Sequence, residues 1–160
     1  MRSRDGRVPD GVAVERALSE GVCGLGGVLA DAPISLDEAL ERAHTQYDDR
    51  VARRLRRFAD VPTGAYVWTR DVEGLFWLGR LGGEWRYDAS EGATNADLVH
   101  VRPCTWLQAP IAESQVPSAV LATFARGGKN WQQTHSEAAE EASAGLWQRA
   151  RQSHLRPQSP

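Results

Sequence analysis

Tryptophan is the residue type in this sequence with the clearest potential for ligand binding. The sequence has six tryptophans in 160 residues, and four of them, Trp68, Trp77, Trp85 and Trp106, lie in the strand patterns between residues 66 and 108. A flat indole ring can stack on a nucleic-acid base, which contributes about 1–3 kcal/mol per base. Small barrels also need large inward side chains, so two or three of these tryptophans are expected in the core. We predict that Trp68, Trp77 and Trp85 include the stacking side chains of a ligand pocket.

Three glycines in one short segment allow close approach of a planar ligand. The backbone amides of Gly24, Gly26 and Gly27 can donate hydrogen bonds to the edge of a ring. These glycines do not form a dinucleotide-binding loop, because no helix follows them. Asn95 or Asp97, where a polar loop ends, could bind a base edge; alternatively both are turn residues in water. The predicted pocket lies at the mouth of a barrel, between the glycines and the tryptophan strands.

Arginine dominates the positive charge of the chain. Lys129 is the one lysine among 19 basic residues, and the planar guanidinium group suits bidentate contacts to phosphates and base edges. Five arginines lie between residues 50 and 57, although the net charge of the chain is −2. This run could guide a nucleic-acid backbone or form a solvated helix face. The candidate phosphate ligands are Arg54, Arg57, Arg70, Arg86 and Lys129.

The sequence carries no pattern typical of an active site. Its four histidines are not near a serine or cysteine nucleophile in a recognisable motif, and no acidic cluster with a Glu-x-Lys nuclease pattern is found. Cys23 and Cys104 are far apart in sequence, which predicts reduced thiols rather than a zinc site. We therefore expect binding without catalysis, and neither a metal nor a cofactor.

Helix and strand patterns alternate along the chain in a clear order. Ser35 and Glu38 form a capping box, which predicts the start of a long helix over residues 36–59. Shorter helices are predicted over residues 12–20, 117–124 and 136–151, and a disordered tail over residues 152–160. Strands are predicted at 21–29, 66–70, 75–81, 84–87, 96–102, 105–108 and 131–134, with a polar loop at 89–95.

The strand spacing indicates the fold class. Five strands between residues 66 and 108 are too close together for a parallel sheet, whose neighbours need long crossovers. We predict an α+β fold: a small antiparallel β-barrel, closed by the strand near Val22, with flanking helices and the 36–59 helix packed outside. A composition of 41% apolar and 25% charged residues fits one globular domain. Without an evident membrane span or secretory signal, we expect a cytoplasmic protein with no membrane partner.

Five segments of the chain follow one another in a familiar order. They are RDGR (4–7), VERALSEGVCGLG (14–26), TGAYVWTR (63–70), LGRLGGEWRYD (78–88) and HVRPCTWL (100–107). In this order they resemble the N-terminal domains of Mrr-type restriction endonucleases and, more distantly, EVE and YTH domains, all of which have PUA-like folds. The resemblance covers residues 4–134 and implies a PUA-like domain over residues 1–134, with a 135–151 helix packed on it. Such domains often have tryptophan where this chain has Gly27, and from the residues after Trp131 we expect no nuclease domain in this chain.

The resemblance implies a nucleic-acid-binding module that receives a modified or flipped nucleotide in an aromatic pocket. DNA is favoured over RNA, and the chain would be the recognition part of a restriction or defence system whose effector protein is another chain, or a stand-alone sensor. Two alternatives stay open. The pocket could hold a free nucleotide or another small planar ligand, or the acidic C-terminal helix could bind a protein. Only nucleic-acid binding should weaken steeply with salt.

Overall fold

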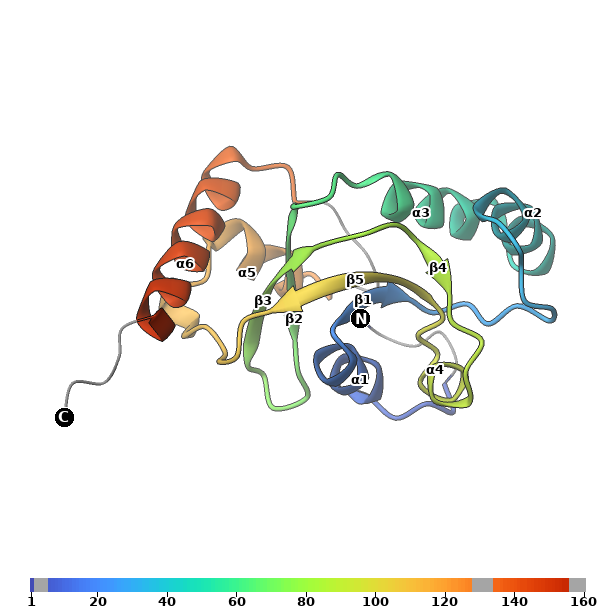
Figure 1. The fold of residues 1–160 in the computed structure, drawn as a ribbon, viewed down its shortest axis with the longest axis horizontal. Coiled ribbons are helices and arrows are strands. Elements are labelled where there is room, and N and C mark those ends of the chain that lie inside the picture. Colours follow the sequence, from blue (N-terminus) through green and yellow to red (C-terminus); the bar gives the residue numbers. More distant parts are fainter. Residues whose placement is uncertain (2–5, 128–133, 156–160) are drawn as a thin grey trace.

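The computed structural model describes residue 1 and residues 6–127 and 134–155. Within them the fold is α+β, with six α-helices around a curled antiparallel sheet that forms a half-barrel (Figure 1). The helices are α1 (Val12–Glu20), α2 (Leu36–Gln46), α3 (Asp49–Asp60), α4 (Glu91–Ala96), α5 (Ser118–Ala125) and α6 (Glu137–Leu155). The strands are β1 (Val22–Leu25), β2 (Tyr66–Arg70), β3 (Phe76–Leu81), β4 (Arg86–Tyr87) and β5 (His100–Trp106), and a 3₁₀ turn, η1 (Glu113–Gln115), precedes α5.

Strand β5 joins the two halves of the sheet. The strand order is β1-β5-β3-β2, with β4 also paired to β5, and every pair is antiparallel. The first part of β5 pairs with β1 and β4, and its last part, from Cys104 to Trp106, pairs with β3. The two ends of this strand order are therefore β1 and β2, and the two-residue strand β4 pairs with β5 beside it. The strand near Val22 does join the sheet, but closing the predicted barrel would require the two edges to pair, and in the described part of the chain they do not.

The main core lies between the sheet and the helices α2 and α3. Phe58 and Leu55 of α3 are almost completely buried and belong to one cluster with Val67 of β2 and Cys23 of β1. Helices α1 and α4 contact each other and cover a second part of the sheet. At the opposite end, α6 packs on β3, where Trp147 and Leu78 share a third cluster (Figure 1).

The helix predicted over residues 36–59 is two helices. Ser35 caps α2 as predicted, since its hydroxyl accepts a hydrogen bond from the Glu38 amide. Helix α2 ends at Gln46, and Asp48 then starts α3 by accepting a hydrogen bond from the Val51 amide at 2.8 Å. An aspartate at this position satisfies an amide that would otherwise lack a partner at the helix start. The continuous apolar stripe concealed this second cap in the sequence.

Residues 89–108 also differ from the prediction. Part of the expected polar loop is α4, whose N-cap Ser90 accepts a hydrogen bond from the Ala93 amide. Asp97 ends α4 in a left-handed conformation, with φ of 48°. The two strands predicted at 96–102 and 105–108 are the single strand β5, which continues through Pro103. The strand stays hydrogen-bonded around this proline, because the Cys104 amide donates to the Gly21 carbonyl and the Gly82 amide donates to the Pro103 carbonyl.

The C-terminal helix is longer than predicted. Helix α6 continues to Leu155, so residues 152–155 are helical rather than part of a disordered tail. The strand expected at 131–134 falls outside the described residues except for Thr134, which has no strand conformation. Residues 156–160 of the expected tail also lie outside them. No helix in the described ranges is long and apolar enough to cross a lipid bilayer.

Arg102 connects the sheet to the end of α3. Its side chain is buried on β5, and its guanidinium group donates to the carbonyl oxygens of Phe58 at 3.1 Å, Val61 at 2.6 Å and Gly83 at 2.9 Å. The last carbonyls of a helix lack intrahelical partners and carry partial negative charge, so a buried cation is stabilised there. This contact fixes the chain that leads from α3 to β2.

Candidate ligand-binding site

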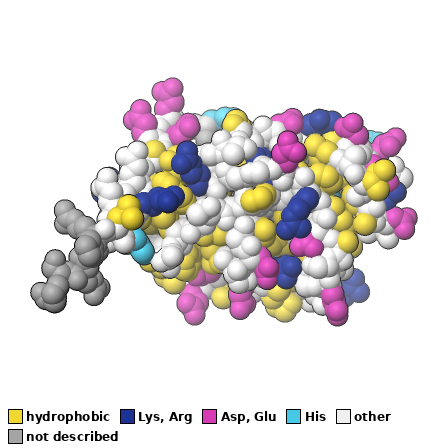
Figure 2. Space-filling view, in the orientation of Figure 1, with side chains coloured by type: hydrophobic (Ala, Val, Ile, Leu, Met, Phe, Trp, Pro, Cys, Tyr) yellow, Lys and Arg dark blue, Asp and Glu magenta, His cyan; other side chains and the backbone are white. Residues whose placement is uncertain are grey.

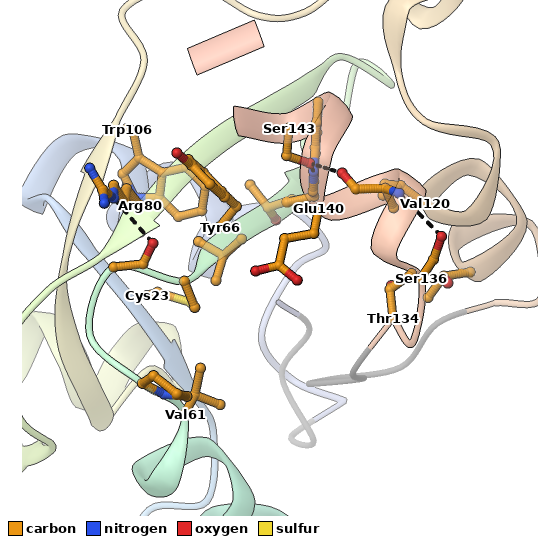
Figure 3. Close-up of a pocket in the computed structure, with 18 of the residues that line it drawn as sticks. Cys23, Val61, Tyr66, Arg80, Trp106, Val120, Thr134, Ser136, Glu140 and Ser143 are labelled. Carbon is orange, nitrogen blue, oxygen red and sulfur yellow. Dashed lines mark hydrogen bonds between the residues drawn. The ribbon is translucent and has the colours of Figure 1, made fainter. Parts of the chain in front are cut away.

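A cavity of about 590 Å³ opens between the two edge strands of the half-barrel. We call it the seam cavity, because it lies where a closed barrel would join β1 to β2. Helices α5 and α6 form its far side (Figure 3). Its lining comes from Met1, β1 (Cys23, Gly24), the chain that leaves α3 (Val61–Ala65), β2 (Tyr66–Thr69), Arg80, Trp106, α5 (Val120, Thr123, Phe124), Thr134, Ser136 and α6 (Ala139, Glu140, Ser143).

Two half-buried indoles are held in fixed positions along the seam cavity. The Nε1 of Trp68 donates to Ser143 Oγ at 3.0 Å, and Ser143 donates in turn to the Ala139 carbonyl of α6 at 2.7 Å. The Nε1 of Trp106 donates to the Val22 carbonyl of β1 at 3.0 Å. Because both indole N–H groups are engaged by the protein, these rings offer their apolar surfaces to the cavity rather than a hydrogen bond.

Polar groups with spare hydrogen-bonding capacity line the same space. Thr69 is 1% exposed, and its Oγ1 has no hydrogen-bond partner among the described residues. Glu140 extends from α6 into the space between α6 and the strands (Figure 3). Across the cavity, Arg80 lies with its guanidinium carbon 5.6 Å from the centre of the Tyr66 ring and donates to the Gly64 carbonyl at 3.1 Å. The cavity thus combines aromatic surfaces with one carboxylate, one guanidinium group and several hydroxyls, of which the buried Thr69 hydroxyl lacks a described partner.

The glycine segment and Asp97, which the sequence placed in a ligand pocket, contact each other. The Gly27 amide donates to Asp97 Oδ1 at 2.8 Å. A Cβ added to Gly26 would lie 2.6 Å from Asp97 Oδ2, so the room that this glycine leaves is filled by the protein itself. Gly24 has its missing side chain directed at the His100 carbonyl, 2.4 Å from an added Cβ, although it also lines the seam cavity. Close approach is the reason for Gly24 and Gly26, but the approaching groups are His100 and Asp97 of the protein itself, whereas Gly27 has a positive φ of 115°.

Trp85 lies next to this glycine segment, where its ring contacts the imidazole of His100. The two rings are stacked with centroids 6.1 Å apart, and Trp85 Nε1 donates to His100 Nδ1 at 3.3 Å. With Nδ1 acting as acceptor, the imidazole proton is on Nε2, which donates to the Gly27 carbonyl at 3.1 Å. Burial lowers the pKa of His100 from 6.5 to about 4, so the ring is neutral near pH 7. This network holds the 26–29 segment against β5.

The other candidate residues are distributed over the surface. Trp77 donates from Nε1 to Asp71 Oδ2 at 2.9 Å in the β2–β3 hairpin, and Asn95 is exposed on α4. Arg70 lies over the Phe76 ring, and Arg86 is 3.8 Å from Asp88. Arg54 and Arg57 are on α3, and Lys129 lies outside the described residues. Of the predicted ligand and phosphate contacts that the structure describes, only Gly24 and Trp68 line the seam cavity.

The arginines of α3 lie on the side of the helix away from the core. Val51, Leu55 and Phe58 are buried, whereas Arg53 and Arg56 are exposed and lie 3.0 and 3.7 Å from Asp49 and Asp37. On the face shown in Figure 2, basic and acidic side chains are interspersed. A positive helix surface is therefore present, but neighbouring carboxylates reduce its charge.

The most informative cavity residues were not singled out in the sequence. Thr69 and Tyr66 flank a predicted tryptophan, and Trp106 was assigned no role. Glu140 lies on α6, 70 residues from the end of β2 along the chain. One sequence pattern points to this face of α6, because Ala139, Ser143 and Trp147 recur every four positions. In the structure these three residues are buried on the side that packs on β2 and β3.

Comparison of the chain with family models, with curated proteins and with solved structures gave no match. The resemblance to PUA-like domains is therefore a prediction from the sequence.

Proposed function

We propose that this chain is a binding module that receives one planar heterocyclic ring, the base of a nucleotide, in the seam cavity. The observation that carries the proposal is the lining itself, where two anchored indoles, Trp68 on one face of the sheet and Trp106 on the other, border a space that also contains an unpartnered hydroxyl. Ligand sites typically have volumes of roughly 300–1,000 Å³ with mostly apolar linings and a few polar groups, and the cavity of about 590 Å³ falls in that range. A single base with part of its sugar fits such a volume.

Nucleic acid is the proposed source of the base. Helix α3 carries five arginines in its sequence, and the chain that leaves α3, Val61 and Pro62, lines the cavity. A nucleotide held in the cavity would therefore have neighbouring phosphates within reach of the last turn of α3, which contains Arg57. Together with the sequence resemblance, this supports a flipped nucleotide, DNA rather than RNA, recognised by a half-barrel of PUA-like type. An effector on another chain would then act on the recognised site.

A free planar ligand is the second candidate, and one observation favours it. The first turns of α6 carry Glu137, Glu140 and Glu141, and Glu140 lines the cavity. Carboxylates near the opening repel phosphates, whereas a neutral ligand would not be repelled. The salt dependence of binding distinguishes the two candidates. In a plot of log K against log salt concentration, each phosphate that the protein neutralises contributes a slope of about −0.7 to −0.9. A free nucleoside should show almost no slope.

The proposed function is tested by two matched tryptophan variants. Trp106→Leu removes an aromatic surface from the cavity, whereas Trp77→Leu removes an indole that hydrogen-bonds outside it. Affinity for single-stranded oligonucleotides, modified and unmodified, is measured by calorimetry, and stability by thermal unfolding. We expect Trp106→Leu to lose about 1–3 kcal/mol of binding free energy, the contribution of one stacked base, and Trp77→Leu to bind normally. Equal binding by wild type and both variants would contradict the proposal.

A further inference from the structure

The hydroxyl of Thr69 is the first indication of what the ring must offer. Thr69 is in an edge strand, lines the seam cavity and is 1% exposed, and no described residue hydrogen-bonds to its Oγ1. Buried polar atoms are nearly always paired, because leaving one unpaired is costly. Valine would fill the same space at this position without that cost. A hydroxyl is therefore expected to serve a partner that is bound in the cavity.

Glu140 is the second indication. Among the described residues of the lining it is the one carboxylate, and the cations are Arg80 and the N-terminal amino group of Met1. Arg80 is already engaged by the Gly64 carbonyl and the Tyr66 ring, and the Ser143 hydroxyl both donates to Ala139 and accepts from Trp68. Glu140 is exposed at the cavity opening, its carboxylate has no side-chain partner of this kind in the described chain, and it points toward the cavity (Figure 3). Its two oxygens are available to a ligand.

A carboxylate constrains the ligand because it only accepts hydrogen bonds. Its two oxygens pair best with two adjacent N–H groups, and such charge-assisted bonds are roughly twice as strong as neutral ones. Among the common bases, guanine presents this edge: a ring N–H beside an exocyclic amino group, with a carbonyl next to them that a hydroxyl can donate to. Adenine and cytosine present one amino group beside a ring acceptor, and thymine presents a single N–H between two carbonyls.

We infer that the seam cavity selects a guanine-type ring, with Glu140 accepting hydrogen bonds from its two adjacent N–H groups and the Thr69 hydroxyl binding its carbonyl. This inference rests on the proposed ring-binding function. According to this inference, Glu140 is the specificity-determining residue. Stacking on the indoles would contribute to the affinity for any base.

The test compares guanosine with inosine, which differs only in lacking the exocyclic amino group. Calorimetric titration of the full chain should give a dissociation constant for guanosine at least about tenfold below that for inosine, because one charge-assisted hydrogen bond is lost. Glu140→Gln should reduce this ratio to about threefold or less, since the amide retains one acceptor oxygen. Glu141→Gln, at the neighbouring glutamate, which is also exposed but does not line the cavity, should leave the ratio unchanged.

A Thr69→Val variant separates the two contacts. It should be at least as stable as wild type in thermal unfolding and should weaken guanosine and inosine equally, because both nucleosides keep the carbonyl. If the wild type binds both nucleosides with the same affinity, or if Glu140→Gln keeps the full preference, the inference is wrong while ring binding stands. If no nucleoside or oligonucleotide binds the wild type at all, the proposed function fails as well.

Discussion

At the scale of single residues, the structure distinguishes side chains whose polar groups are bonded within the protein from a side chain whose polar group has no described partner. Trp85 and His100 satisfy each other and the glycine segment, whereas Thr69 has no described partner. The sequence shows which residues are aromatic or polar, but not whether a neighbour already uses them. That Gly26 accommodates Asp97, 71 residues away along the chain, depends on tertiary contacts that no local pattern contains.

His100 should make the stability of the protein depend on pH. Its pKa in the folded chain is about 4, below the ordinary value of 6.5, because burial disfavours the charged ring. Between these two values the unfolded chain binds more protons, so the free energy of unfolding decreases as the pH falls through this window. Over the whole window the loss should be on the order of 3 kcal/mol.

Urea unfolding of wild type and His100→Gln at several pH values measures this effect. The variant should show a smaller decrease between pH 7 and pH 4, while His44→Gln, at an exposed histidine, should follow the wild type. Parallel curves for His100→Gln and wild type would show that His100 is not the group responsible.

At the scale of helices and strands, local signals predicted most elements, and the errors have identifiable causes. The β2 strand and the start of α2 are as predicted, because alternation and the capping box are local. The break at Asp48 was missed because the apolar stripe continues across it, and α4 was missed because its residues are small and polar. Strand β5 continues through Pro103 because neighbouring residues supply the hydrogen bonds.

Arg102 is the residue on which the junction between α3 and the sheet depends most. Arg102→Lys keeps the charge but provides one nitrogen in place of a planar group that bonds several carbonyls. We expect a loss of roughly 2–4 kcal/mol in the free energy of unfolding, since buried carbonyls lose charge-assisted partners. Chemical denaturation measures the loss, with the exposed Arg57→Lys as control. A loss below about 0.5 kcal/mol, the usual range for surface changes, would contradict this role.

At the scale of the whole molecule, the site arises from the incomplete closure of the barrel. The spacing of the strands predicted an antiparallel sheet, and the sheet is antiparallel. Whether β1 meets β2 depends on the curvature of β5 and on the helices that pack at the seam, which sequence patterns do not specify. The cavity consequently includes Glu140 and Ser143 of α6, and the tryptophans predicted to act together are divided between separate places.

The division of the tryptophans allows the central claim to be tested in one measurement. The indole N–H resonances of Trp68, Trp77, Trp85 and Trp106, assigned with single Trp→Phe variants, are followed by NMR while a short guanine-containing oligonucleotide is added. Rings that face the bound base should shift, because its ring current acts over short distances. We predict shifts for Trp68 and Trp106, with Trp77 and Trp85 unchanged. Shifts confined to Trp77 or Trp85, or no shift at saturating oligonucleotide, would contradict binding in the seam cavity.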